Sequence, residues 1–267
     1  MSIKTIIAVV VLYSFFSSCN LFCQELPMVI VVPSYNNAER YKENLISIFT
    51  QNYTNYRVVY VDDCSHDGTA DLVESFVLQY SQKHRCKVVR NTIRCGALKN
   101  LYDTIHSCDD NEIIVTLDGD DCLYTPEVLS ILNAAYSSQN IWLTHGTLFE
   151  TYYKSTEWSI PIPENIIKQN AFRSYRCPSH LRTFYAWLFK KIKKEDLMYK
   201  GSFFPMAWDQ AMMFPMIEMA GEKHAFIKDI LYLYNNTLPT NDNRINSNLQ
   251  SNLETVIRAM SPYEKLI

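Results

Sequence analysis

From residue 28 onward, short apolar runs alternate with segments in which apolar residues recur at helical spacing. The apolar runs, which contain Val or Ile and have the length of strands, lie at residues 28–32, 57–61, 87–90, 112–117 and 141–144. The segments with helical spacing lie at residues 41–49, 72–80, 98–105 and 128–135. This alternation predicts an α/β fold with a mainly parallel sheet that is flanked by helices on both faces.

Beyond about residue 150 the alternation fades. A Met-rich stretch at residues 207–220 predicts a helix, and residues 225–234 predict one more strand. Residues 173–194 mix aromatic and basic side chains and give no clear pattern. Residues 235–252 are polar and rich in Asn, which indicates a loop before a short helix.

Polar residues and turn formers follow three of the predicted strands directly. The first strand is followed by Pro-Ser-Tyr-Asn-Asn (33–37), the second by Asp-Asp-Cys-Ser-His-Asp-Gly (62–68), and the fourth by Asp-Gly-Asp-Asp (118–121). In open α/β sheets, ligands bind beyond the carboxyl ends of the strands. We therefore expect these three segments to share one edge of the sheet and to form one site.

The acidic segment after the fourth strand predicts a metal site. In extended chain, Asp118 and Asp120 point to the same side, and Gly119 between them leaves room for a phosphate to approach. Two carboxylates together with substrate phosphate oxygens are a usual ligand set for Mg²⁺ or Mn²⁺. The alternative interpretation is a solvated acidic turn, and the position after a buried strand favours the metal.

The other two segments allow both binding and structural roles. A carboxylate of Asp62 or Asp63 is placed to accept hydrogen bonds from a pyrimidine N–H or a ribose hydroxyl, whereas Asp67 reads as a helix cap. Tyr35 is placed to lie against a nucleobase. The neighbouring Asn side chains are equally suited to capping the next helix.

These three motifs, in this order and rough spacing, resemble the family 2 glycosyltransferases, whose fold is called GT-A. The resemblance covers about residues 28–135. It implies a single GT-A-like domain with a nucleotide-sugar-binding half at residues 28–135 and an acceptor-binding half at residues 136–267. It also implies a metal-dependent enzyme that transfers a sugar, with inversion, from a nucleotide-diphosphate donor such as a UDP-sugar to an acceptor hydroxyl.

The resemblance further implies which residues bind the nucleotide and the metal. Asp62 and Asp63 would contact the nucleobase, Asp118 the ribose, and Asp120, with Asp118, a Mn²⁺ or Mg²⁺ ion. The remaining nucleotide-site candidates are Pro33, Tyr35, Asn37, Arg94, Gly96, Lys99 and Gly119. Lys99 stands where the family usually has Arg, so the bidentate fork is lost and only the charge is kept.

An inverting enzyme of this family needs a carboxylate base in its second half. Trp-Asp-Gln (208–210) resembles that position, with Trp where Glu is usual, and Asp209 is therefore the predicted base. The alternative for Asp209 is a helix cap, and the two roles are compatible. Arg182 and His180 are candidates to meet the diphosphate or the acceptor. His145, His180 and His224 are the candidates for a third metal ligand.

The length and the net charge of the chain limit the classes of protein to which it can belong. The 267 residues suit one large α/β domain, and a net charge of -3 with a pI near 6.1 gives no basic stripe for a nucleic acid. We expect the acceptor to be a glycan, a lipid or a protein. A receiver-type signalling domain would be shorter, and a nucleotidyltransferase would show a Gly-rich basic loop. An inactive sugar-nucleotide-binding protein is the remaining alternative.

The first residues form a separate segment. Lys4 precedes an apolar stretch at 6–16, and small residues follow, which is the layout of a secretory signal. Residues 5–23 are also just long enough to span a membrane, and a third interpretation makes Phe-Ser-Ser-Cys (16–19) a loose lipoprotein-type cleavage site. The remaining alternative is a core strand and helix of the domain. We expect a signal peptide or anchor at 1–24, a catalytic domain at 25–267, and a location in the secretory lumen or at a membrane. Six cysteines remain after the leader, an even number compatible with disulfides in an exported domain.

Overall fold

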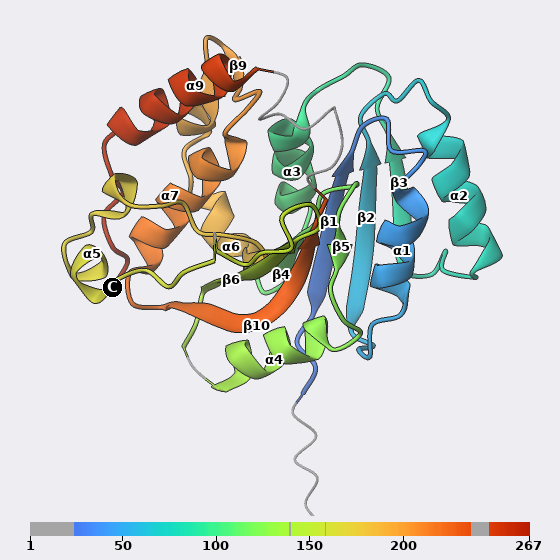
Figure 1. The fold of residues 1–267 in the computed structure, drawn as a ribbon, viewed down its shortest axis with the longest axis horizontal. Helices are drawn as coiled ribbons and strands as arrows, with labels where there is room; N and C mark the ends of the chain where they lie inside the picture. The colour runs from blue at the N-terminus through green and yellow to red at the C-terminus, as the bar shows by residue number, and fades with distance from the viewer. Residues whose placement is uncertain (1–23, 139, 158, 236–245) are drawn as a thin grey trace, which may run out of the picture.

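The computed structural model describes residues 24–138, 140–157, 159–235 and 246–267 (Figure 1). Within them, one sheet of eight strands has the order β3-β2-β1-β4-β7-β6-β10-β5. Its strands are β1 Met28–Ser34, β2 Tyr56–Asp62, β3 Cys86–Arg90, β4 Ile113–Thr116, β5 Cys122–Leu123, β6 Leu143–Glu150, β7 Arg182–Tyr185 and β10 His224–Tyr234. A second, two-stranded sheet pairs β8 Met198–Tyr199 with β9 Ser202–Phe203.

The sheet is mainly parallel, as predicted. Strand β1 lies between β2 and β4 and is parallel to both, and β3 extends the parallel part at the edge. Strand β7 is antiparallel to both of its neighbours, β4 and β6. Strand β10 is parallel to β6 and antiparallel to the short β5. Strands from both halves of the chain thus form one continuous sheet, and the fold is a single domain of the predicted class.

Helices cover both faces of this sheet (Figure 1). Alternate residues of each strand enter different cores, because successive side chains of a strand point to opposite faces. One face of β1 packs with α1 Tyr41–Phe49, α2 Thr69–Gln79 and α4 Val128–Ser138. The other face packs with α3 Ala97–His106, α6 Ala186–Lys190, α7 Trp208–Ala220 and α9 Ser247–Ala259. The short elements α5 Glu164–Lys168, η1 Phe172–Ser174 and η2 Lys194–Leu197 join them.

The Met-rich helix α7 is the central helix of its layer. Every residue from Gln210 to Ala220 is buried, which agrees with a sequence that is apolar on all sides. The one acid in this buried stretch, Glu218, is fully buried and is paired with Arg173, whose Nε lies 2.6 Å from Glu218 Oε1. Helix α7 is therefore held from several sides, and its first turn, which carries Asp209, has a defined position at the edge of the sheet.

Strand β1 is longer than predicted. The sequence suggests that Pro33 ends the strand, but β1 continues through Pro33 to Ser34 and pairs there with Val61 and Asp62 of β2. The pairing with β4 ends three residues before Ser34, at Val31. A residue of a parallel strand directs its N–H to one neighbouring strand only. Pro33 lacks an N–H, and this costs no ladder hydrogen bond because the pairing with β4 has already ended.

Candidate functional site

The predicted convergence of the strand ends is present in the structure. The backbone N–H of Asp63 donates to the carbonyl of Ser34 at 2.8 Å, and the N–H of Gly119 donates to the carbonyl of Pro33 at 3.1 Å. The segments that follow β1, β2 and β4 are therefore hydrogen-bonded to one another at a single edge of the sheet.

Gly119 is needed for close packing within this edge. A Cβ at this position would lie 2.6 Å from Asn37 Nδ2 and 2.7 Å from Ser34 Oγ, distances that real Cβ contacts do not reach. Asn37 Nδ2 itself donates to Ser34 Oγ at 2.9 Å. The sequence interpretation gave Gly119 the task of leaving room for phosphate, but protein atoms fill the space where its side chain would stand. Asn37 likewise contacts Ser34 instead of presenting a free amide.

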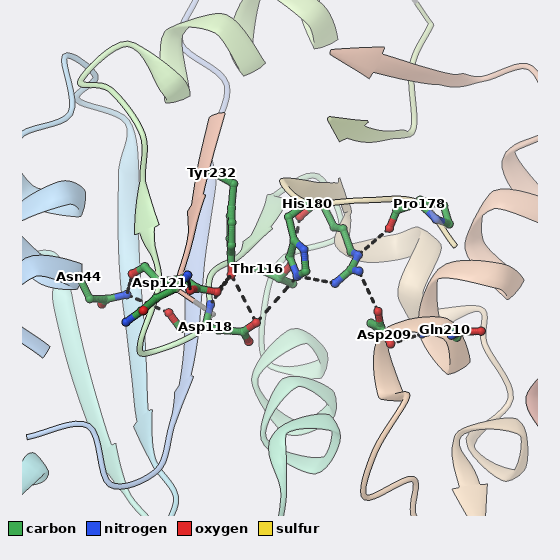
Figure 2. Close-up of polar contacts among 11 residues, drawn as sticks. Asn44, Thr116, Asp118, Asp121, Pro178, His180, Asp209, Gln210 and Tyr232 are labelled. Carbon is green, nitrogen blue, oxygen red and sulfur yellow. Dashed lines mark hydrogen bonds and ion pairs between the residues drawn. The ribbon is translucent and has the colours of Figure 1, made fainter. Parts of the chain in front are cut away.

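The acidic loop is fixed by residues that the sequence did not single out. Asn44 of α1 donates from its side chain to the carbonyls of Asp118 and Asp121, at 3.0 and 2.8 Å. The buried Asp121 accepts hydrogen bonds from the Tyr232 hydroxyl and the Asn235 backbone, both at 2.6 Å. Figure 2 shows these contacts on one side of Asp118. Asn44 carried a sequence signal, since it is a polar residue on the buried face of an amphipathic helix.

Negative charge is concentrated at this loop. Burial, followed by the charge of Asp120, raises the pKa of Asp118 to about 7. Burial and the charges of Asp120 and Asp118 likewise raise the pKa of Asp121 well above its ordinary value. The negative charges of Asp118 and Asp120 repel each other, and a bound divalent cation would remove this repulsion. The two carboxylates therefore have the chemistry of a divalent-cation site.

No protein side chain completes a larger metal cluster in the part of the chain that the structure describes, where no group of three or more His, Cys, Asp or Glu could hold an ion. His180 lies nearest, with Nε2 3.9 Å from Asp118 Oδ2, but Nε2 also accepts a hydrogen bond from Arg182 Nη1 at 2.7 Å. His145 and His224 lie against each other, with ring centroids 5.7 Å apart. The structure therefore gives no support to a third ligand among these three histidines.

The two acids after β2 have different surroundings. Asp63 Oδ1 accepts from Asn91 Nδ2 and the Cys95 N–H, and Oδ2 accepts from the Gly96 N–H, each at 2.8 Å. Burial by itself would raise the pKa of Asp63, but these donors outweigh it and lower the pKa. Asp62 Oδ2 accepts from the Ser65 N–H at 3.1 Å, whereas its buried Oδ1 has no partner among the described residues. Asp63 thus anchors the loop before α3, whereas Asp62 keeps one oxygen that no described residue occupies.

The remaining nucleotide-site candidates lie on the same side of the edge. The guanidinium of Arg94 stacks over the ring of Tyr35 at 3.8 Å. Gly96 has a φ of 86° directly before α3, a backbone conformation that side-chain-bearing residues rarely adopt. Lys99 pairs with Asp103 one turn further along the same helix. The structure therefore brings Tyr35 and Arg94 into contact and uses Lys99 in a pair on the surface of α3.

The predicted base lies on the other side of the acidic loop. Asp209, in the first turn of α7, accepts a hydrogen bond from Arg182 Nη2 to its Oδ2 at 2.8 Å. The side chain of Asp209 is 28% exposed, and that of Arg182 only 6%. Figure 2 shows the residues in a row, from Asp118 through His180 to Asp209. The charge of Asp209 also contributes to the raised pKa of Asp118, so the two carboxylates belong to one electrostatic site.

Two predictions about the rest of the chain have separate outcomes. All six cysteines of the described residues are free thiols, so the even number does not reflect disulfides among them. The leader predicted at 1–24 falls, apart from its last residue, outside the described residues. Among the residues that are described, no helix is both long and apolar enough to cross a membrane.

Comparison with known proteins gives consistent matches. The model of the family described as Glycosyl transferase family 2 matches residues 29–197, well over half of the chain. A putative glycosyltransferase, EpsE of Bacillus subtilis (strain 168), is 31% identical over 99 residues, which are 36% of this chain and 34% of that protein. The chain thus matches about a third of the length of this relative.

Two solved structures share the fold. The S. aureus TarS fragment 1-349 in complex with UDP-GlcNAc superimposes with a TM-score of 0.58 at 17% identity, covering 80% of this chain and 59% of that one. The mannosyltransferase PcManGT from Pyrobaculum calidifontis, in complex with GDP-Man and Mn²⁺, gives a TM-score of 0.58 at 19% identity, covering 90% and 66%. At these identities the likeness establishes the architecture.

Proposed function

The chain belongs to glycosyl transferase family 2, and from this premise we propose that it transfers a sugar from a nucleotide-diphosphate donor to an acceptor hydroxyl with inversion. The observation that carries the proposal is that Asp118 and Asp209 lie in one electrostatic site: the charge of Asp209 contributes to the raised pKa of Asp118, and Arg182, which binds Asp209, also contacts His180 beside Asp118. Such a site offers a carboxylate group for the donor side and another for the acceptor side, as an inverting displacement requires.

Asp118 and Asp120 would hold Mn²⁺ or Mg²⁺ together with the donor phosphates. The ion would act as a Lewis acid that neutralises the charge appearing on the departing diphosphate. The raised pKa of Asp118, about 7, supports this assignment because a carboxylate crowded by another negative charge gains most from a cation. PcManGT, which shares the fold, was solved with Mn²⁺ and a sugar nucleotide.

The nucleotide would lie over the ends of β1 and β2. Asp62 Oδ1, buried and without a protein partner, is suited to accept a hydrogen bond from the N–H of a pyrimidine ring. Tyr35 and Arg94 offer a flat surface beside it. We favour a UDP-sugar as donor, and the complex of TarS with UDP-GlcNAc is consistent with this choice.

Asp209 would act as the base. Its Oδ2 is bound to Arg182, and its Oδ1 accepts the N–H of the adjacent Gln210 at 2.9 Å and no other hydrogen bond from the described part of the chain, so Oδ1 is the oxygen directed to the acceptor. The proton of the acceptor hydroxyl passes to Asp209 as the acceptor oxygen bonds to the anomeric carbon. The bond from that carbon to the phosphate oxygen breaks, and its electron pair leaves with the diphosphate.

The acceptor and the location are part of the same proposal. We propose a glycan, lipid or protein acceptor and a place in the secretory lumen or at a membrane, on the strength of the apolar segment that begins after Lys4. The chain matches about a third of the length of EpsE, so the acceptor and the location are proposals for this chain and are not carried over from that relative.

The proposal is tested by a donor screen. Purified protein is incubated with UDP-glucose, UDP-GlcNAc, UDP-galactose and GDP-mannose, with Mn²⁺ or with EDTA, and release of nucleotide diphosphate is measured. We expect Mn²⁺-dependent release from at least one UDP-sugar, and stabilisation by UDP in a thermal melt. Stabilisation by UDP without any turnover would indicate an inactive binding protein. Absence of both would overturn the proposal.

A further inference from the structure

Arg182 occupies the position between the two sides of the site. It begins β7, its carbonyl accepts a hydrogen bond from Thr116 Oγ1 of β4 at 3.1 Å, and its side chain is almost fully buried. All three nitrogens of its guanidinium have partners. Nε donates to the Pro178 carbonyl at 2.8 Å, Nη1 contacts His180 Nε2 at 2.7 Å, and Nη2 donates to Asp209 Oδ2 at 2.8 Å.

The contact with His180 defines the state of that ring. Arginine is always protonated and only donates, so Nε2 of His180 must be an acceptor and the ring is neutral with its proton on Nδ1. Burial, and then the charge of Arg182, lower the pKa of His180 well below its ordinary value, which agrees with a neutral ring. A neutral His180 does not compete with Arg182 for Asp209, while the charge of Arg182 acts on both Asp209 and Asp118.

The same ring fixes the guanidinium relative to the acidic loop. His180 stacks on Tyr232 with centroids 4.5 Å apart, and Tyr232 donates to the buried Asp121. Arg182 is thereby held on one side by the framework of the acidic loop and on the other by Asp209. A planar guanidinium with fixed donors can orient a carboxylate in a way that a flexible ammonium group cannot.

We propose that Arg182 is a positioning residue that sets the orientation of Asp209 relative to the donor site. This rests on the proposed role of Asp209 as base. Arg182 acts through Asp209, by occupying Oδ2 so that Oδ1 faces the acceptor. Because small displacements of reacting groups cost large factors in rate, loosening this contact lowers turnover and leaves donor binding intact.

The chain offers a matched control at a second contact with helix α7, made by Arg173 of η1. Arg173 is also buried, with its side chain 9% exposed, and it pairs with Glu218 of α7 nine residues after Asp209. Arg173 holds α7 as Arg182 does, but it contacts no residue of the site. If Arg182 acted only by securing α7, a change at Arg173 would have the same effect on turnover.

The test compares Arg182→Lys with Arg173→Lys in donor hydrolysis, using the UDP-sugar that the wild-type protein hydrolyses fastest with Mn²⁺. For Arg182→Lys we expect kcat to fall by about 10- to 100-fold with KM for the donor unchanged. For Arg173→Lys we expect a lower unfolding temperature and an unchanged kcat. In an Asp209→Asn background, adding Arg182→Lys should cause no further loss.

Three results would overturn the assignment: an unchanged kcat in Arg182→Lys, an equal fractional loss in the Asp209→Asn background, or the same loss in Arg173→Lys. If Arg182→Lys unfolds below the assay temperature, Arg182→Gln, whose neutral donor ends two bonds short of the position of Nη2, takes its place, and the same loss of kcat is expected. If the wild-type protein releases no nucleotide diphosphate, the proposed function is refuted. If the wild-type protein is active and Arg182→Lys has the same kcat, only the positioning role is refuted.

Discussion

Gly119 lies directly against Ser34, so that a Cβ at Gly119 would come within 2.8 Å of the Cβ of Ser34. The acidic loop after β4 and the end of β1 are therefore in van der Waals contact through a position that has no side chain. Since Gly119 separates Asp118 from Asp120, the position of both carboxylates depends on this contact.

We predict that Gly119→Ala lowers the free energy of unfolding by about 1–3 kcal/mol, the usual cost of overpacking. It should also weaken the stabilisation that UDP and Mn²⁺ give in a thermal melt, because the loop must move. Adding Gly119→Ala to Ser34→Gly should cost less than adding it to the wild-type protein, since two of the three closest atoms are then absent. Equal costs in both backgrounds would mean that Ser34 is not the obstacle.

A matched pair of variants distinguishes the acids after β2. Asp63→Asn should lower the free energy of unfolding by about 2 kcal/mol, because hydrogen bonds to a charged acceptor are lost in the loop before α3. Asp62→Asn should change stability less and reduce affinity for UDP. Chemical denaturation and titration with UDP measure the two effects. If instead Asp63→Asn has wild-type stability and binds UDP more weakly than Asp62→Asn does, Asp63 is the residue that contacts the nucleobase.

His145 makes the fold sensitive to acid. It is 1% exposed on β6, neither ring nitrogen has a partner within the residues that the structure describes, and burial followed by the charge of His224 lowers its pKa to about 3. The unfolded chain takes up a proton near pH 6.5 and the folded one does not, so stability is retained above pH 6.5 and lost as pH falls toward 3. The contribution of His145 is about 1.4 kcal/mol for each pH unit in this window.

We therefore expect His145→Phe, which keeps a ring of similar size, to lose less stability than the wild-type protein between pH 7 and pH 5. The measurement is the free energy of unfolding by denaturant at several pH values. His66→Phe, at an exposed position in the loop after β2, supplies the control for replacing a histidine by a phenylalanine outside the core. Parallel curves for His145→Phe and wild type would show that His145 does not cause the acid sensitivity.

Much of the fold follows from local pattern. The runs at 28–32, 57–61 and 87–90 became β1, β2 and β3, and the Met-rich stretch became α7, because period and bulk are local properties. Strand β7 had no such signal. It has only four residues, and its antiparallel place between β4 and β6 is decided by partners far away in the sequence. Strand β5 has two residues, which is too short for a periodic pattern of apolar residues to be recognised.

The candidate site shows the same division. The rule that ligands bind at the carboxyl ends of strands brought the segments at 33–37, 62–68 and 118–121 together correctly. Sequence could not assign Asp62 and Asp63 to different tasks, because adjacent residues turn to opposite sides and only the position of the loop before α3 decides which one is enclosed. The contact of Arg182 with Asp209 spans 27 residues between two elements and left no local trace.

Asp209→Asn should separate binding from chemistry. The amide keeps the shape of the side chain but cannot accept the acceptor's proton, so turnover should fall by about 10²- to 10⁴-fold, the usual contribution of a general base. Stabilisation by UDP with Mn²⁺ should persist. Turnover at the wild-type rate would place the base elsewhere, and loss of UDP binding would mean that Asp209 serves the donor side.

The most direct measurement is Mn²⁺-dependent release of nucleotide diphosphate from a UDP-sugar by wild-type protein and by Asp120→Ala. We predict that release by the variant falls by about 100-fold or more, because charge on the departing diphosphate is no longer neutralised. Its unfolding temperature should not fall, since removing Asp120 relieves the repulsion that raises the pKa values of Asp118 and Asp121. Equal Mn²⁺-dependent release by both proteins would contradict the assignment of this acidic loop as the donor's metal site.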